Sequence, residues 1–169
     1  MTYQIWNQGS DRLNRFLRQT TGVLSLALLS VGLGCSGEEA DLRFVDPATT
    51  FKTYQQAVAD RDLDLLWSCY STTYKDTIDQ AAWTVEWEAK SPDAIRAELR
   101  LEIIDEQKIN QKIGYLLMDP TTLESPQVSP FFYFLHEEQG WKITTYLDSV
   151  FHHELEQAIA RGEYSLPTF

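Results

Sequence analysis

The sequence predicts an α+β domain over residues 47–169, in which N-terminal helices pack on a curved antiparallel sheet and a C-terminal helix closes the chain. Three observations support this fold class. Apolar residues recur at helical spacing up to Lys90, alternate with polar residues from Glu98, and return to helical spacing after Ser149. Helices followed by antiparallel strands are typical of folds in which the helices cover one face of the sheet.

Two helices open the predicted domain. Asp46 can cap the first helix, and Pro47 follows at the first helical position, where proline is well tolerated. The second helix begins after Asp62, so the pair forms a short hairpin. The apolar faces consist of Phe51, Tyr54, Ala57 and Val58 in the first helix and of Leu63, Leu66, Trp67 and Tyr70 in the second.

A third helical segment, residues 77–90, is apolar on two faces. Trp83 and Trp87 lie one turn apart, opposite an arc that is rich in alanine. If the alanine arc packs on the domain, both indoles are exposed and form a docking patch for a partner protein, an apolar ligand or lipid. We favour the inverse orientation, with both indoles buried, because an indole buries far more area than a methyl group.

The helical pattern then gives way to four expected strands. The first begins at Glu98, because Leu99, Leu101 and Ile103 alternate with polar residues. The remaining strands are residues 109–118, 129–137 and 141–147.

Turn signals and a last helix complete the predicted domain. The four residues "EEQG" join the final two strands as a tight hairpin. Residues 119–130 contain three prolines and are expected to form a loop. Ser149 is the expected cap of the closing helix, which Gly162 can end.

Residues 1–34 have the layout of an export signal. Basic residues, ending at Arg18, precede 19 residues without a charge, which run up to Glu38. The apolar core of this run, residues 23–33, has the length expected of a signal sequence. The alternative is an uncleaved transmembrane helix, since about 20 apolar residues are enough to cross a bilayer.

The uncharged run contains, near its end, the sequence "VGLGC", which resembles the lipobox of bacterial lipoproteins. The resemblance implies that residues 1–34 are removed and that Cys35 carries acyl chains such as palmitate, so the membrane is a partner through the N-terminal lipid. It also implies an exported lipoprotein of the cell envelope, in the outer membrane if the host has one, because Ser36 follows the cysteine. Residues 35–46 are then an acidic tether between lipid and domain.

The competing role for Cys35 is a disulfide with Cys69, the other cysteine of the chain. We favour the lipid, because two cysteines are a weak disulfide signal. Cys69 lies in an apolar helical stripe and is expected to be a small core residue.

The charge of the chain excludes one class of partner. The formal net charge is -11, and it becomes -13 without residues 1–34, because that segment holds three arginines and one aspartate. An acidic surface without a basic cluster repels phosphate backbones, so we expect no nucleic-acid binding.

Two further stretches resemble the nuclear transport factor 2-like superfamily, which includes ketosteroid isomerases and SnoaL-type cyclases. They are "YQQAVADRDLDLLWSCYS", similar to the opening hairpin of that superfamily, and "FFYFLHEEQGWKITTY", similar to its final strand pair. The resemblance implies a cone-like domain over residues 47–169, with a pocket at its open end. In this superfamily the pocket holds a small molecule or docks a partner, so the fold alone does not select a function.

Candidates for catalysis are few. Aligned with the isomerase pattern, Asp79 is the one available general base, and Tyr54 is a conceivable hydrogen-bond donor. The histidines at 136, 152 and 153 lack the three or four ligands that a stable metal site needs. The sequence therefore predicts no cofactor, no metal and no catalytic residue, and leans against an enzyme.

The preferred interpretation is a lipid-anchored, noncatalytic binding module that accepts an apolar small molecule or an envelope protein. An isomerase or dehydratase that uses Asp79 and Tyr54 is one alternative, and a structural component of an envelope assembly is another. The oligomeric state is not predicted. The pocket is expected to be lined by some of Tyr54, Trp67, Tyr70, Trp87, Phe132, Phe134 and Trp141.

Overall fold

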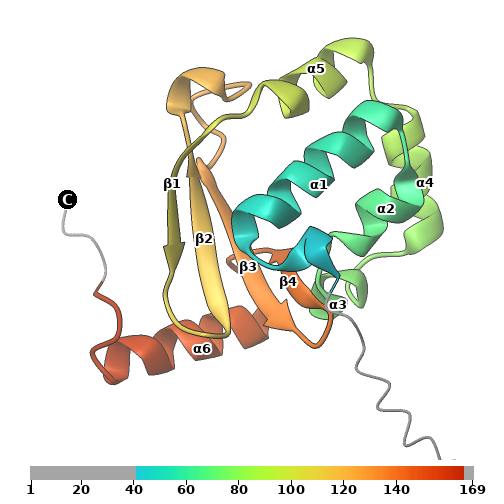
Figure 1. The fold of residues 1–169 in the computed structure, drawn as a ribbon. Helices are drawn as coiled ribbons and strands as arrows, with labels where there is room; N and C mark the ends of the chain where they lie inside the picture. The colour runs from blue at the N-terminus through green and yellow to red at the C-terminus, as the bar shows by residue number, and fades with distance from the viewer. Residues whose placement is uncertain (1–40, 166–169) are drawn as a thin grey trace, which may run out of the picture. The chain divides into compact units, whose positions relative to one another are not determined.

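The computed structural model describes residues 41–165 and has the predicted α+β class. Within these residues, a four-stranded antiparallel sheet in the order β1-β2-β3-β4 carries several helices on one face and a single helix on the other (Figure 1). The strands are β1 (Ile103–Lys108), β2 (Ile113–Met118), β3 (Phe131–Glu137) and β4 (Gly140–Thr144). The helices are α1 (Pro47–Asp60), α2 (Leu63–Ser68), α3 (Thr72–Lys75), α4 (Gln80–Glu88), α5 (Pro92–Arg100) and α6 (Ser149–Ala160), with short 3-10 turns η1 (Leu42–Phe44) and η2 (Pro120–Thr122).

The opening helical hairpin is present as predicted. Asp46 caps α1 by accepting a hydrogen bond from the backbone N–H of Thr49 at 2.6 Å. The helix ends at Arg61, whose left-handed backbone has a φ of 54°, and Asp62 caps α2. This turn lays the apolar face of α1 on the sheet, where Phe51 is buried.

The structure corrects the prediction for residues 77–102. A separate helix, α5, occupies the start of the expected first strand, so β1 begins at Ile103 and not at Glu98. Ser91 accepts a hydrogen bond from the backbone N–H of Ala94 at 3.2 Å, and Pro92 is the first helical residue. This cap and proline start a helix that the alternation of apolar residues concealed.

The two outer strands of the sheet differ in how their edges are covered. Among the described residues, β1 pairs only with β2, and it is irregular between Ile103 and Asp105. At the other edge, Ile143 of β4 donates a hydrogen bond to the carbonyl of Cys69 and accepts one from the N–H of Ser71, both at 2.8 Å. The segment after α2 therefore covers the outer edge of β4.

The folded domain begins earlier than the sequence prediction placed it. We expected a tether through residue 46, but η1 packs on the domain and Phe44 is 3% exposed. Gly140, with a φ of +100°, lies directly below it, because a Cβ atom there would be 2.3 Å from the carbonyl oxygen of Phe44. The rest of the predicted tether, residues 35–40, lies outside the described residues, as does the predicted signal segment.

Hydrophobic clusters lie on both faces of the sheet. The larger one includes Leu116 and Phe134 and is covered by α1, α2 and α4. The smaller one packs Phe151 and Leu155 of α6 against Ile113 and other residues of the sheet. The closing helix is confirmed, although its cap is Asp148 and not Ser149.

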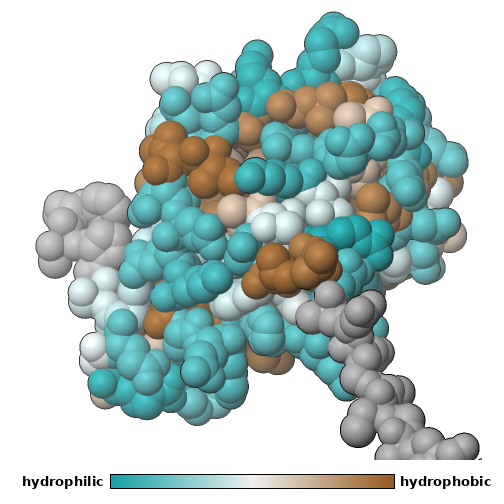
Figure 2. Space-filling view, viewed as in Figure 1, coloured by the Kyte–Doolittle hydropathy of each residue, from teal (hydrophilic) through white to brown (hydrophobic). Residues whose placement is uncertain are grey.

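The face drawn in Figure 2 is mostly hydrophilic, with several separate hydrophobic patches. The most exposed large apolar side chains are Leu147, Leu42 and Val85. No helix within residues 41–165 has both the length and the apolar character that a bilayer crossing requires.

Candidate functional site

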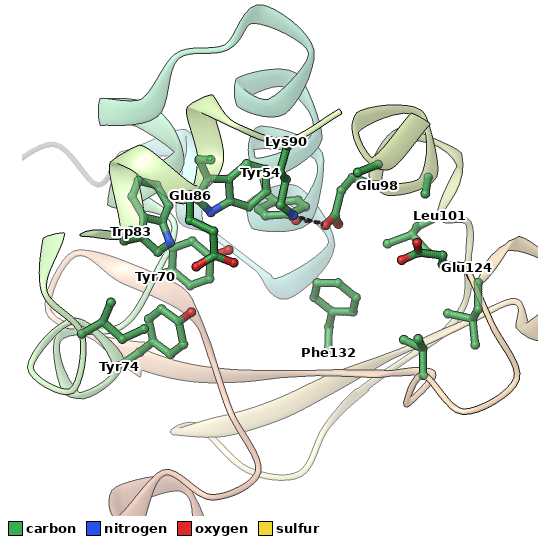
Figure 3. Close-up of a pocket in the computed structure, with 16 residues that line it drawn as sticks. Tyr54, Tyr70, Tyr74, Trp83, Glu86, Lys90, Glu98, Leu101, Glu124 and Phe132 are labelled. Atoms are coloured by element: carbon green, nitrogen blue, oxygen red, sulfur yellow. Dashed lines mark hydrogen bonds and ion pairs between the residues drawn. The ribbon is translucent and has the colours of Figure 1, made fainter. Parts of the chain in front are cut away.

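A cleft of about 450 Å³ lies on the helical side of the sheet, where α1, α4 and α5 approach the start of β3 (Figure 3). Six aromatic side chains contribute to its wall: Tyr54, Tyr70, Tyr74, Trp83, Trp87 and Phe132. Four charged residues also line it: Glu86, Lys90, Glu98 and Glu124. The cleft thus combines a large aromatic surface with an excess of carboxylates.

The two tryptophans of α4 form one end of the aromatic wall. Trp83 is 5% exposed and Trp87 is 8% exposed, and their ring centroids are 5.8 Å apart. Val85, on the opposite face of α4, is 65% exposed. The exposed docking patch considered for Trp83 and Trp87 is therefore wrong, and the buried orientation is confirmed, because the larger side chains occupy the apolar interior.

Aromatic contacts hold the cleft wall in a fixed arrangement. Tyr70 stacks on Tyr74 with ring centroids 4.6 Å apart. Tyr54 makes edge contacts with Tyr70, Trp87 and Phe132 at centroid distances between 6.1 and 6.3 Å. Such offset and edge-to-face pairs each add about 0.5–1.5 kcal/mol beyond the burial of area.

One charged pair lies inside this aromatic wall. Lys90 Nζ is 2.8 Å from Glu98 Oε1 and 3.7 Å from the ring centroid of Trp87. The hydroxyl of Tyr54 donates a hydrogen bond to Glu98 Oε2 at 2.7 Å. Burial, with Tyr70 and Glu98 close by, raises the pKa of Tyr54 well above its usual value. Tyr54 is therefore a protonated donor, and its partner Glu98 is held by two groups.

The predicted pocket residues divide into two groups. Tyr54, Tyr70, Trp87 and Phe132 line the cleft, as expected. Trp67, Phe134 and Trp141 do not line it. Phe134 is fully buried in the core, Trp67 packs behind Trp83 at a centroid distance of 4.8 Å, and Trp141 packs against His136.

The sequence did not predict the charged and small residues that α5 contributes to the cleft, among them Ala94, Ala97 and Glu98. Glu98 was expected to begin a strand and no helix was expected over residues 91–97, so the common helical face of these residues was not recognised. The pair Ser91-Pro92 was the signal that could have revealed this helix.

The structure does not assemble the catalytic pair considered for an isomerase. Asp79 is exposed and caps α4 by accepting a hydrogen bond from the backbone N–H of Ala82 at 2.8 Å. It does not line the cleft, whereas Tyr54 does. The structure therefore places Asp79 at the start of α4 and does not bring it together with Tyr54 in the cleft.

The remaining candidate side chains lie outside the cleft. Cys69 is fully buried, as expected of a core residue, and burial raises the pKa of its thiol to about 12. His152 and Glu156 form an exposed pair at 3.4 Å. Residues 41–165 hold no group of three or more side chains that is arranged to bind a metal ion. Cys35, the proposed site of lipidation, lies outside the described residues.

Sequence and structure were also compared with known proteins. No protein-family model, curated protein or solved structure matches this chain.

Proposed function

We propose that this protein is a lipid-anchored, noncatalytic binding module of the cell envelope, whose cleft accepts an apolar ligand or an apolar segment of a partner protein. The observation that carries the proposal is the wall of six aromatic rings around a cleft of about 450 Å³. Ligand sites are typically concave, lined by aromatic side chains and provided with a few polar groups.

The groups in the cleft favour binding over catalysis. Lys90 and Glu98 neutralise each other as an ion pair, and burial raises the pKa of Tyr54. A general base must accept a proton near the working pH, and Tyr54, which stays protonated, does not. A cleft of this size also favours a binding module over a purely structural component of an envelope assembly.

The proposal includes a domain of the nuclear transport factor 2-like type with a cone-like sheet. Its support is that both stretches that resemble this superfamily form hairpins: α1 with α2, and β3 with β4. The two hairpins pack together through α1 and β4. A crystal structure in which the sheet does not curl around α1 would contradict this part.

Filling the cleft tests the binding proposal. Ala97 lies on the cleft wall, so Ala97→Phe should abolish binding of the neutral fluorescent probe N-phenyl-1-naphthylamine by the full chain in lipid nanodiscs. The matched control is Ala59→Phe, on the exposed face of α1, which should leave binding unchanged. Equal binding by both variants, or none by the wild-type chain above empty nanodiscs, would reject the proposed ligand site.

The anchor has a separate test, which does not depend on the cleft. Cells that express the wild-type chain or Cys35→Ala are grown with a clickable fatty acid, and the protein is then isolated and labelled. We expect label on the wild-type chain and none on the variant. Label of equal intensity on Cys35→Ala would reject lipidation at this residue.

A further inference from the structure

The charges around the cleft are unbalanced. Three carboxylates and one ammonium line it, which gives a formal charge of -2. Glu98 is paired with Lys90, whereas the salt bridges found within residues 41–165 include neither Glu86 nor Glu124. In the view of Figure 3, Glu86 lies at the end with Trp83 and Tyr70, and Glu124 lies at the other end near Leu101.

The cleft already holds one cation of its own chain. The ammonium of Lys90 lies over the face of Trp87 at 3.7 Å and against the carboxylate of Glu98 at 2.8 Å. This combination of an aromatic face and a carboxylate is the chemistry that proteins use to bind alkylammonium groups. Trp83, Tyr70 and Tyr74 provide further rings near Glu86, where no residue of the cleft wall supplies a second ammonium.

We propose that the cleft selects a small organic cation, an ammonium or quaternary ammonium group on an apolar body. This inference rests on the proposed binding function and names its ligand class. The apolar body packs against the rings, and the positive group lies beside Glu86 or Glu124. Anionic ligands are disfavoured because the unpaired carboxylates repel them, and neutral ligands lack the attraction to the carboxylates and the ring faces.

Two probes of the same shape isolate the charge. (4-Hydroxyphenyl)trimethylammonium has the shape of 4-tert-butylphenol, but a positively charged nitrogen replaces the central carbon of the tert-butyl group. Titration calorimetry of the full chain in nanodiscs of neutral lipid, with empty nanodiscs as the blank, should show at least about tenfold tighter binding of the cation. The anion 4-hydroxybenzenesulfonate should not bind.

Substitutions in the cleft assign the effect to particular residues. Glu86→Gln and Glu124→Gln together should weaken binding of the cation by about fivefold or more and leave 4-tert-butylphenol unchanged. The control is Glu138→Gln, which removes a charge from the exposed turn before β4, away from the cleft. Lys90→Met should strengthen binding of the cation, because it frees the face of Trp87 and the carboxylate of Glu98.

The outcomes separate this inference from the function on which it rests. Equal affinity for the two probes, or weaker cation binding by Lys90→Met, overturns the preference for a cation. Binding of N-phenyl-1-naphthylamine that Ala97→Phe abolishes would then still support an apolar ligand site. Loss of both kinds of binding rejects the two proposals together.

Discussion

At the scale of single residues, Lys142 is a cation in an apolar environment. Its side chain is 3% exposed, and its ammonium donates a hydrogen bond to the carbonyl of Ser68 at 2.8 Å. The same ammonium lies 3.1 Å from the ring centroid of Phe44. Burial, reinforced by the nearby charge of Lys75, lowers the pKa of Lys142 from 10.5 to about 8.

This pKa predicts a stability that rises with pH above about 8. Between pH 8 and 10.5 the unfolded chain binds more protons at Lys142 than the folded chain, so the free energy of unfolding increases with pH. The slope is at most about 1.4 kcal/mol per pH unit for one group. Urea unfolding between pH 7.5 and 8.5, below the range in which the raised pKa of Cys69 acts in the opposite direction, should show the rise in wild type and lack it in Lys142→Met.

Lys52→Met is the control for this measurement, because Lys52 is exposed on α1. It should retain the rise of the wild-type protein. A rise of equal size in Lys142→Met would assign the effect to other groups.

The residues of the cleft show what a sequence can predict at this scale. The stripe predicted for the second helix and the alternation of β3 placed Tyr70 and Phe132 on inward faces, and both line the cleft, although Tyr70 lies beyond the end of α2. Phe134 shares the face of Phe132 but lies two residues further along β3, inside the core. Periodicity predicts which face of a strand or helix a side chain lies on. It does not predict which neighbouring elements cover each position along that face.

At the scale of elements, hydrogen bonds to Asp148 connect the start of α6 to α3 and β4. One carboxylate oxygen accepts hydrogen bonds from the hydroxyls of Thr73 and Thr144, and the other accepts from the backbone N–H groups of Val150 and Phe151. Burial alone raises the pKa of Asp148, but these hydrogen bonds outweigh it and lower the pKa below its usual value of 3.8. The carboxylate therefore joins α3, β4 and α6.

The lowered pKa predicts that Asp148 stabilises the fold above about pH 4 and loses this effect as the pH falls through its folded-state value. Asp148→Asn should lower the free energy of unfolding at pH 7 by about 1–3 kcal/mol, because buried hydrogen-bond partners lose a charged acceptor. The difference from wild type should shrink below pH 4. Urea unfolding at several pH values measures both effects.

Asp79→Asn is the matched control, since Asp79 also caps a helix but is exposed and accepts one backbone hydrogen bond. Asp79→Asn should lower the free energy of unfolding at pH 7 by less than Asp148→Asn does. This loss should not depend on the hydroxyls of Thr73 and Thr144. A cost equal to that of Asp148→Asn would contradict the role assigned to the hydroxyl pair.

The hairpin between β3 and β4 depends on Gly140 for two reasons. Its φ of +100° disfavours any other residue, and a Cβ atom would meet the backbone of Phe44. Gly140→Ala should therefore lower the free energy of unfolding by about 2–3 kcal/mol, through backbone strain and displacement of η1. Gly162→Ala, which has a positive φ but open space around it, should cost less. Equal costs would show that contact with η1 is not important.

The elements that could be predicted are those with a cap and a single apolar face. Helix α1 has both features in its sequence: Asp46 is the cap before Pro47, and an apolar stripe follows them. Helix α5 could not be predicted from its stripe, because Ile95 packs against the core while Leu99 is 38% exposed, so its apolar positions do not follow the burial. Of the helices that build the cleft, α1 could therefore be predicted, whereas α5 could not be predicted from its stripe.

At the scale of the whole molecule, β1 is the strand with a free edge in the described sheet. Its sequence, "IIDEQK", places exposed carboxylates at Asp105 and Glu106, directly after the irregularity at Ile103. Charges and bulges on an edge strand oppose pairing with another chain. The outer edge of β4 has a partner in the segment after α2.

Neutralising the edge should promote self-association. The double variant Asp105→Thr with Glu106→Thr should sediment as larger species than wild type at the same concentration, because threonine favours strands and no longer repels a neighbour. Glu138→Thr with Glu156→Thr removes as much charge at exposed positions outside the strands and should sediment like wild type. Association of both variants would assign the effect to net charge alone.

The guarded edges have a consequence for a protein confined by its proposed lipid to a plane. Molecules held on a surface meet one another far more often than molecules free in a volume. An unprotected edge strand would therefore pair with a strand of a neighbouring molecule and form an intermolecular sheet. The segment after α2 covers one edge of the sheet, and carboxylates lie on the strand at the other edge. Both features oppose strand pairing between neighbouring molecules, so contacts between molecules at high surface density stay reversible.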